Sequence, residues 1–506
     1  INTENFKIIL NKKNRIYSIT LFFLWIIFTF MELVGITSIP FFLSILFEST
    51  NSFKIPILDN FFLIFEGLEK KQIFIYLVGI IITIFLIKNV FFAFLIYFEQ
   101  LAVKSISLDI KKRTFYYYFK RPFKEQYKSN SSDIIRKVNF DSANAVTYIN
   151  SLLALVFQLF LTTSITVYLL YVDFFLTLTI LIFFIVILSA IYLYSSKRLS
   201  LYGKLKQKYG GKGIKIINEG MNNIKEVILY NKINFLTTLY SQVQLEQQNN
   251  ILKINLFKRI PRGIFELLSI SFILFVVLFK IFINGESVQS TIVFLTLLVI
   301  SLARILPSIN QISMNFSNMK SSEYSFFLIT NCLFELNKLN EMEEKKTDDN
   351  LKFKFTKSIN FDSVSFGYNN RLKLFNNLNF EIKKNSIIGI FGESGSGKST
   401  ILNLLTGLLN PDNGNIFIDQ FNLNKNKNKD FWQKIIGYIP QDNFLLDETI
   451  KKNIIFSNEL EILDKQSLEK AVNISKLDKF LLSLKDGLDT RIGDRGINIS
   501  GGQRQR

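Results

Sequence analysis

The chain has no histidine and a single cysteine, Cys332, among its 506 residues. A lone thiol cannot close an intrachain disulfide, and it cannot assemble a zinc cluster without histidine. Acidic residues are also in the minority, with 41 Asp and Glu against 60 Lys and Arg, so the formal net charge is +19. Apolar residues are abundant instead: they make up 49% of the chain, include 53 Phe, and are concentrated before residue 320. This composition favours a membrane protein over a soluble one.

Six apolar stretches in the first part of the chain are each about as long as a helix needs to cross the hydrocarbon layer. The first is too long for a secretory signal and no small-residue cleavage site follows it, so we interpret it as a retained span. The sequence therefore predicts six membrane spans, at Ile16 to Phe47, Ile73 to Phe98, Ala145 to Val172, Phe174 to Tyr194, Ile264 to Ile283 and Thr291 to Ile312.

The basic residues indicate how these spans are oriented. The N-terminal segment and the long segments 99–144 and 195–262 are rich in Lys and Arg, so the positive-inside rule predicts that all three are cytoplasmic. The outward connections are then the loop after Phe47, a tight turn at Asp173 and a short stretch at 284–286. Since the positive charge is accounted for by membrane insertion, we do not expect the chain to bind nucleic acid.

The cytoplasmic segments are too long to be simple loops. Residues 101–119 and 197–209 continue the helical pattern of the adjacent spans, which predicts stalks that extend out of the membrane. Between the stalks, 132–138 and 221–228 each begin with a polar residue able to cap a short helix and continue with spaced aliphatic residues. We interpret both as coupling helices that dock on a second domain, although ordinary turns would also fit.

The second part of the chain differs in pattern. We expect a transmembrane domain at 1–320, a charged linker at 321–350 and a nucleotide-binding domain at 351–506. Short strands are predicted at Ile359 to Phe366, Phe375 to Ile382 and Ser386 to Phe391, followed by a helix from Lys398 to Gly407. The loop before this helix and its first turn have the phosphate-binding pattern Gly392, Glu393, Ser394, Gly395, Ser396, Gly397, Lys398, Ser399, Thr400.

The chemistry of this loop follows from its residue types. Glycines allow successive backbone amides to point inward and hold phosphate oxygens at the N-terminus of a helix. Lys398 would contact the outer phosphates of ATP, and the Ser399 hydroxyl would bind Mg²⁺. A strand, a glycine-rich loop and a helix in this order are the context that a true phosphate loop requires.

The run Ile499 to Gln503 resembles the signature of ATP-binding cassette (ABC) proteins. The resemblance implies further roles: Tyr368 would stack on adenine, Gln441 of the Q-loop would approach Mg²⁺ and the attacking water, and 490–496 would lie beside the coupling helices. It also implies that ATP bound at Lys398 is completed in trans by Ser500, Gly501, Gly502 and Gln503 of a second chain. We therefore expect a homodimer, with a paralogous partner as the alternative.

One transmembrane domain before one cassette is similar to the layout of half-size ABC exporters, with an all-helical six-span domain and an α/β phosphate-loop domain. In that family a catalytic Glu and a switch His follow the signature. These 506 residues contain no His and end at Arg506, before the Walker B strand. We therefore expect a truncated cassette that binds ATP and does not hydrolyse it at a normal rate.

Ionisable residues inside the spans point to the cargo, because they are costly in hydrocarbon and usually face a cavity or a partner. Such residues are Glu32, Lys88 and Arg304, and Arg262 stands at the cytoplasmic entrance of the fifth span. Lys88, Arg262 and Arg304 would suit an anionic head group such as a diphosphate. The alternative is structural: Glu32 and Lys88 lie at similar depth and would neutralise each other.

Segments around Glu32, at 130–136, at 259–262 and at 303–308 resemble bacterial flippases of lipid-linked oligosaccharides (PglK type), as does a possible outer helix at 57–65. The resemblance implies ATP-driven flipping of a polyprenyl-diphosphate-linked glycan across the bacterial inner membrane. An exporter of another lipid, a drug or a peptide is the alternative, and a non-transporting membrane ATPase is a third possibility. The motifs do not identify the glycan.

Overall fold

The computed structural model describes residues 3–46, 70–127, 129–172, 174–278, 288–344, 355–368, 373–424, 426–441, 443–456, 465–493 and 496–506. The chain divides into two compact units, Ile1–Asp349 and Asn350–Arg506. The expected linker at 321–350 is helical as far as Glu344, where it forms the end of a long helix of the first unit.

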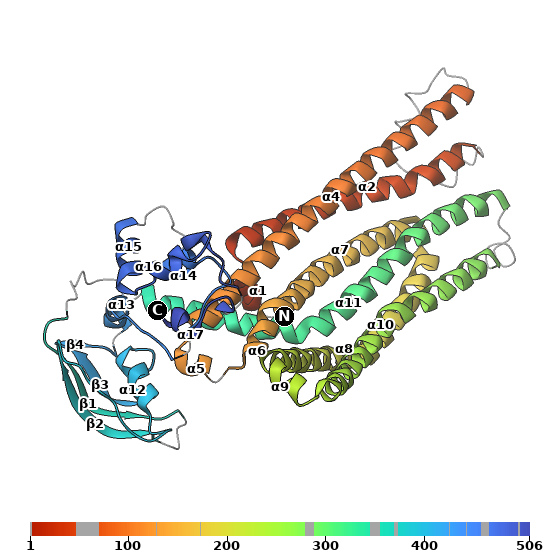
Figure 1. The fold of residues 1–506 in the computed structure, drawn as a ribbon. Helices are drawn as coiled ribbons and strands as arrows, with labels where there is room; N and C mark the ends of the chain where they lie inside the picture. Colours follow the sequence, from red (N-terminus) through yellow and green to blue (C-terminus); the bar gives the residue numbers. More distant parts are fainter. Residues whose placement is uncertain are drawn as a thin grey trace. The chain divides into compact units, whose positions relative to one another are not determined.

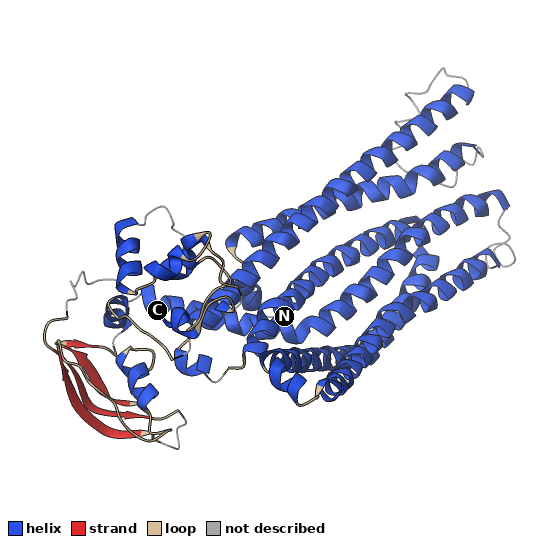
Figure 2. Ribbon diagram, in the orientation of Figure 1, coloured by secondary structure: helices blue, strands red, loops and turns tan. Residues whose placement is uncertain are grey.

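The first unit is built from helices, as Figures 1 and 2 show. Six of its described helices are longer than thirty residues and run side by side as long rods (Figure 1). The long helices are α2 (Lys12–Leu46), α4 (Lys70–Lys120), α7 (Ser142–Val172), α8 (Phe174–Asn222), α10 (Ile233–Leu278) and α11 (Val288–Glu344). The shorter elements are α1 (Thr3–Ile9), α5 (Phe123–Tyr127), α6 (Ser131–Arg136), the π-helical η2 (Lys137–Asp141) and α9 (Ile224–Leu229).

Each predicted span falls on one long helix, so the prediction of a six-span helical domain is confirmed at the level of the fold. Three stretches of the described residues are long and apolar enough by composition to cross a membrane: Lys12–Ile39, Lys71–Lys120 and Ser131–Val172. Phe47, residues 279–283, the turn at Asp173 and the possible outer helix at 57–65 lie outside the described residues.

The predicted stalks are confirmed. Residues 101–119 belong to α4 and 197–209 to α8, so both helices continue well beyond their apolar parts. Helices α6 and α9 stand where the coupling helices were predicted. In α6 the cap is Asn130, whose side chain accepts a hydrogen bond of 3.0 Å from the Ser132 amide. In α9 the residue before the helix, Asn223, makes no side-chain capping bond.

Two apolar cores hold the first unit together. In the stalks, Ile110, Ile149, Phe326 and Ile329 are nearly inaccessible and belong to one cluster from α4, α7 and α11. In the apolar part, residues of α2, α4, α7, α10 and α11 form a second cluster that includes Trp25, Leu95, Phe157, Phe265 and Ile305. The two clusters hold together helices that are far apart in the sequence, one cluster in the stalks and the other in the apolar part.

The stalk of α8 approaches α11 very closely at Gly203. A Cβ atom at this position would lie 2.1 Å from the carbonyl oxygen of Ser321 and 2.7 Å from its carbonyl carbon. The obstacle is backbone, so it cannot be relieved by a side-chain rotation. Glycine is required here by the distance between two helix backbones, which outweighs its low helix propensity.

The second unit contains a small antiparallel sheet in the order β2-β1-β3-β4, drawn in red in Figure 2. Its strands are β1 (Ser358–Phe366), β2 (Phe375–Lys383), β3 (Asn413–Ile418) and β4 (Phe421–Asn422). Buried side chains of β1 and β3, including Phe361, Phe366 and Ile416, give the sheet an apolar face. The helices are α12 (Lys398–Leu405), α13 (Asn426–Lys434), α14 (Ile450–Ile455), α15 (Lys465–Ile474), α16 (Asp478–Leu482), the 3-10 turn η4 (Gly487–Asp489) and α17 (Gly501–Gln505).

The prediction of a strand at Ser386 to Phe391 was wrong for the described structure, since these residues pair with no strand among those described. A strand is defined by a neighbour that takes up its amides and carbonyls. The segment before Gln441 is likewise outside the sheet. The apolar side chains of the first segment are exposed, with Ile387 and Phe391 almost fully accessible.

Replacing Gly203 by alanine is expected to lower the stability of the first unit, because the new methyl group forces α8 and α11 apart. The expected loss is about 2–3 kcal/mol, as for overpacked cores. The measurement is the thermal unfolding midpoint of the detergent-purified chain. Gly79→Ala is the matched control, since a Cβ at Gly79 meets nothing within 4 Å; equal midpoints for the two variants would contradict the close-approach explanation.

Candidate functional site

The phosphate loop has the backbone conformation that its glycines predict. Gly395 and Gly397 have φ of 87° and 97°, in the left-handed region that glycine tolerates best. A Cβ at Gly397 would lie 2.5 Å from the Phe375 ring, and one at Gly392 would lie 2.8 Å from the Ser396 hydroxyl. Side chains at these two positions would fill the cradle, so only glycine leaves it open.

Helix α12 begins directly after this cradle, with Gly397 as its N-cap. The amino group of Lys398 lies across the loop and donates hydrogen bonds of 2.7 Å to the Gly392 carbonyl and 2.6 Å to the Glu393 carbonyl. Ser399 is exposed, whereas Thr400 is buried. The lysine charge and the positive end of the helix therefore lie close together, which suits a phosphate group.

The Tyr368 side chain joins the phosphate loop to the end of β1. Its hydroxyl lies 3.3 Å from the Thr400 hydroxyl, and its ring packs edge-on against Phe366 at 5.1 Å. The predicted aromatic residue is therefore beside the loop. Its role in stacking on adenine stays a prediction.

The signature residues form the start of α17. The Ser500 amide donates to the Gln503 side chain at 2.8 Å, and the Gln503 amide donates back to the Ser500 hydroxyl at 3.3 Å, which makes a capping box. Both Gly501 and Gly502 are exposed, and a Cβ at either meets nothing within 4 Å. The capping box fixes the turn and leaves the glycine backbone accessible, as a helix start that receives a phosphate from elsewhere requires.

Gln441 is exposed. After it, the chain pairs with the segment before the signature: Thr449 bridges Arg491, and the Ile492 amide donates to the Glu448 carbonyl at 3.2 Å. The loop at 490–496 is thus tied to the region after the Q-loop, while Asp494 and Arg495 lie outside the described residues. The binding of Mg²⁺ by Ser399 and Gln441 stays a prediction.

A second candidate site lies among the apolar helices of the first unit. The Glu32 carboxylate lies 3.1 Å from the Lys88 amino group and 2.7 Å from the Arg304 Nε. The side chains of Glu32 and Lys88 are 4% exposed, whereas that of Arg304 is 47% exposed. Gly35 is next to Lys88, and a Cβ there would make an ordinary contact of 3.6 Å with the amino group. Helices α2, α4 and α11 therefore meet at one carboxylate shared by two cations.

A cavity of about 220 Å³ adjoins this ion cluster, and its lining includes Asn89, Gln158, Ser308 and Gln311 besides the three charged residues. The structure thus brings together two of the three residues predicted to bind substrate, Lys88 and Arg304. The third, Arg262, does not line the cavity and is exposed on α10. One turn before it, burial lowers the pKa of Lys258, and the nearby charge of Lys206 on α8 lowers it further.

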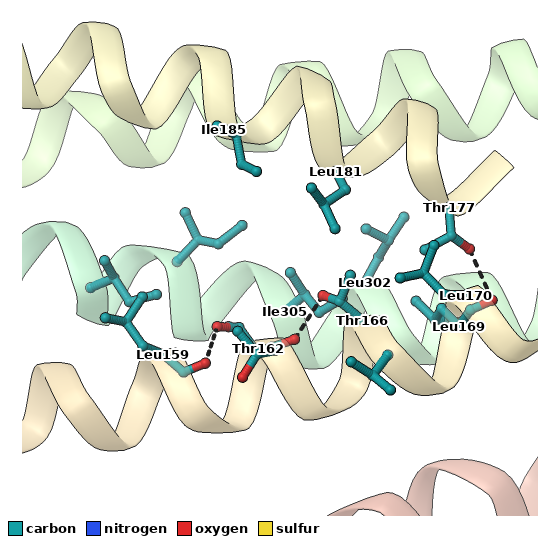
Figure 3. Close-up of a pocket in the computed structure, with 14 residues that line it drawn as sticks. Leu159, Thr162, Thr166, Leu169, Leu170, Thr177, Leu181, Ile185, Leu302 and Ile305 are labelled. Atoms are coloured by element: carbon teal, nitrogen blue, oxygen red, sulfur yellow. Dashed lines mark hydrogen bonds between the residues drawn. The ribbon is translucent and has the colours of Figure 1, made fainter. Parts of the chain in front are cut away.

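Figure 3 shows a different cavity, of about 260 Å³, between α7, α8 and α11. Its threonine hydroxyls are directed to backbone carbonyls: Thr162 donates to Gln158 at 2.8 Å, Thr166 to Thr162 at 2.7 Å, and Thr177 to Leu169 at 3.0 Å. The remaining lining is aliphatic, with Leu302 and Ile305 among it. This cavity suits hydrocarbon and offers no charged group to a polar ligand.

Sequence reasoning found Lys88 and Arg304 and offered the pairing of Glu32 with Lys88 as an alternative, but it missed that Arg304 also contacts Glu32. The signal was present, because these three are the charged residues in the middle of predicted spans. The pairing of Glu32 with Lys88 follows from adjacent antiparallel helices. The contact with Arg304 joins positions 272 residues apart, so it depends on the packing of α11 against α2, which no local pattern encodes.

The comparisons with known proteins agree with both units. The family model described as ABC transporter matches residues 375–506. A putative export ATP-binding/permease protein of Rickettsia typhi is 39% identical over 153 residues, which is 30% of this chain and 26% of that protein's length. An ATP-dependent lipid A-core flippase of Coxiella burnetii is 26% identical over 431 residues, which is 84% of this chain and 71% of that protein.

The fold of the whole chain is similar to that of a solved bacterial Atm1-family ABC exporter with ATP bound. The match has a TM-score of 0.68 at 17% identity and covers 97% of this chain and 82% of that one. At this identity the likeness shows the fold alone. It includes the helical unit, which the family model does not reach.

Replacing Lys398 by alanine is expected to weaken ATP binding by roughly ten- to a hundredfold, since a charged hydrogen-bond donor is lost. The measurement is titration of the purified chain with a fluorescent ATP analogue. The matched control is Lys470→Ala, which removes an exposed lysine of α15. If both variants bind ATP as tightly as the unchanged chain, Lys398 does not contact the phosphates.

Replacing Glu32 by alanine is expected to destabilise the chain by about 3–5 kcal/mol, because Lys88 is left buried without its carboxylate. The thermal unfolding midpoint in detergent measures this loss. Adding Lys88→Met to Glu32→Gln removes both buried charges at similar volume and should recover most of it. A midpoint that Glu32→Ala leaves unchanged, or that the double variant lowers further, would show that the ion pair does not stabilise the fold.

Proposed function

We propose that this chain works as an ATP-driven flippase for a lipid with an anionic head group, since its cassette matches the ABC transporter family model and its fold is similar to that of an ABC exporter. The narrower proposal is a polyprenyl-diphosphate-linked oligosaccharide. The observation that carries it is the cluster of Glu32, Lys88 and Arg304 beside a polar cavity in the apolar part of the helical unit.

ATP use is supported by the open glycine cradle and by the position of Lys398 at its mouth. In this proposal the amides of the loop and Lys398 hold the phosphates, Tyr368 contacts the base, and Ser399 and Gln441 hold Mg²⁺. When bound, Mg²⁺ supplies positive charge that neutralises the phosphate oxygens. The residues of this chain position the nucleotide and exclude other orientations.

The proposal includes a homodimer. Support comes from the exposed Gly501 and Gly502 at the start of α17, whose amides are free to bind a phosphate held by the loop of a second chain. ATP binding would then join two cassettes, and α6 and α9 would transmit the closure to the stalks. The basic stalks support an orientation in which the N-terminus and the ATP-binding domain are cytoplasmic. The membrane in this proposal is the inner membrane of a bacterium.

The charge of the ion cluster supports an anionic cargo. Two cations share one carboxylate, so the cluster has a formal charge of +1. Lys88 is buried against Glu32, and a stacked Phe85 ring lies 4.5 Å from its amino group. Arg304 lies 2.7 Å from Glu32 through its Nε and its side chain is 47% exposed, so we expect part of the guanidinium group to be accessible to a phosphate.

A general exporter of lipids, drugs or peptides with the same architecture is the second candidate. The name of the Coxiella burnetii relative, a lipid A-core flippase, favours a lipid over a peptide or drug. The apolar cavity in Figure 3 also favours cargo with hydrocarbon chains, because its polar atoms are already bonded to backbone. A membrane ATPase without transport would not need either cavity.

Replacing Arg304 by alanine is expected to reduce stimulation of ATPase activity by a polyprenyl-diphosphate glycan roughly tenfold or more, since one charged contact with phosphate is lost. The full-length protein in liposomes is the sample, and both ATPase stimulation and glycan translocation are measured. Unstimulated ATPase activity should stay unchanged.

Lys197→Ala is the control, since it removes an exposed cation of α8 that does not line the cavity. Arg304→Lys should keep part of the stimulation, because the charge remains and the second hydrogen bond is lost. Full stimulation of the Arg304→Ala protein, or no response of the unchanged protein to the glycan, would favour the general-exporter candidate.

A further inference from the structure

A third cavity lies in the stalk region of the helical unit, and it is lined by basic residues. Its volume is about 560 Å³, larger than the two cavities described above. Five of its lining residues are basic and one is acidic, so the lining has an excess of four positive charges: Arg136, Lys204, Lys208, Lys212 and Lys215 against Asp133. We propose that this cavity binds a soluble phosphate-bearing anion, such as a polyphosphate.

The four lysines form a continuous stripe on α8. Positions 204, 208, 212 and 215 follow one another at helical spacing, so their side chains share one face of the helix. Like charges three or four residues apart destabilise a helix. An anion bound along the stripe would remove this repulsion.

The carboxylates near the cavity pair with Arg136 and Lys215, which line it, and with Lys137. Asp133 accepts from Arg136 at 2.7 Å and from Lys137 at 2.8 Å, and Glu219 pairs with Lys215 at 3.5 Å. Among the described residues, no ion pair involves Lys204, Lys208 or Lys212. Three lysines thus present uncompensated charge to one cavity.

The back wall of the cavity is rigid, which suits a binding site. The Arg136 side chain is 13% exposed and crosses α8 at Gly211, where a Cβ would lie 3.0 Å from its Cδ. Behind it, the buried Asp141 carboxylate accepts from the Ser325 hydroxyl at 3.0 Å, and the Gln207 amide donates to that hydroxyl in turn. Nearby, the Ser132 hydroxyl accepts from the Asn218 amide at 2.9 Å.

The position along α8 favours a soluble ligand over a lipid head group. Lys204 and Lys215 follow the end of the predicted span at Tyr194 by about 15 and 30 Å along the helix axis, at 1.5 Å per residue. The head-group layer adds only about 5–8 Å to each side of the hydrocarbon. A membrane lipid would therefore not reach the far end of the stripe.

Binding there would add to contacts that already join α6 to α8, such as the hydrogen bond from Asn218 to the Ser132 hydroxyl. The cavity is walled by α6, α8 and Tyr324 of α11. An anion between α6 and the lysine stripe would hold the short helix against the stalk. Occupancy of the cavity would thus strengthen the attachment of α6 to the α8 stalk.

The test uses the 506-residue chain carrying Lys398→Ala, so that the phosphate loop does not contribute, in nanodiscs of zwitterionic lipid. Isothermal titration with tripolyphosphate should show one site per chain. Affinity should fall as ionic strength rises from about 0.1 to 1 M, where the screening length shortens from about 10 to 3 Å. Replacing Lys204, Lys208 and Lys212 by glutamine should weaken binding by roughly tenfold or more.

The control removes three lysines of the α4 stalk, Lys104, Lys111 and Lys112, by the same substitution; it should bind as the parent does. Replacing the three cavity lysines by arginine keeps the positive charge and should retain binding. This control distinguishes a loss of charge from a loss of folding in the glutamine variant. No binding by the parent chain, or equal affinity in the cavity and control variants, would overturn the proposal. Protection of Lys208 from amine modification only by anionic lipid, without tripolyphosphate binding, would overturn the soluble-ligand assignment.

Discussion

The hydrocarbon layer admits this chain only where each backbone amide and carbonyl is paired within the chain. Continuous helices meet that requirement. Helices α4, α8 and α10 continue far beyond their apolar stretches. At 1.5 Å per residue the 49 residues of α8 span about 74 Å, more than twice the hydrocarbon thickness. The same rod therefore carries membrane contacts at one end and, in its stalk, the contacts of Gly203 and the basic cavity. A displacement of α6 or α9 would act on α8 at its stalk end.

The same requirement governs side chains. Threonines in the apolar cavity bond to the carbonyls of their own or a neighbouring helix, so their hydroxyls add no polarity to the lining. Glu32 cannot be satisfied in this way, because a carboxylate accepts hydrogen bonds and every carbonyl of the helix does so too. It requires cations from other helices. Lys88 and Arg304 supply them: Lys88 is buried with Glu32, whereas the Arg304 side chain is 47% exposed.

How much of this could be predicted from the sequence depends on the range of the interactions. The long helices and the phosphate loop follow from local patterns, since apolar runs and glycine spacing act within a few turns. The sheet was less predictable: Ser386 to Phe391 has the composition of a strand, but a strand also needs a neighbour, and composition does not supply one. The contact of Gly203 with Ser321 and that of Glu32 with Arg304 join distant positions. Only the packed structure reveals them.

The proposed anion sites are of two kinds, which differ in how selective they can be. The phosphate loop uses backbone amides and a helix end, which fix the directions of hydrogen bonds and select the shape of a phosphate chain. The ion cluster and the lysine stripe use side-chain charge, which attracts anions of many shapes and is screened by salt. Specificity for a cargo would then come less from the charges than from the shape and polarity of the cavities beside them. In the helical unit, the polar cavity beside Arg304 has a lining suited to a head group. The apolar cavity between α7, α8 and α11 has a lining suited to a hydrocarbon chain.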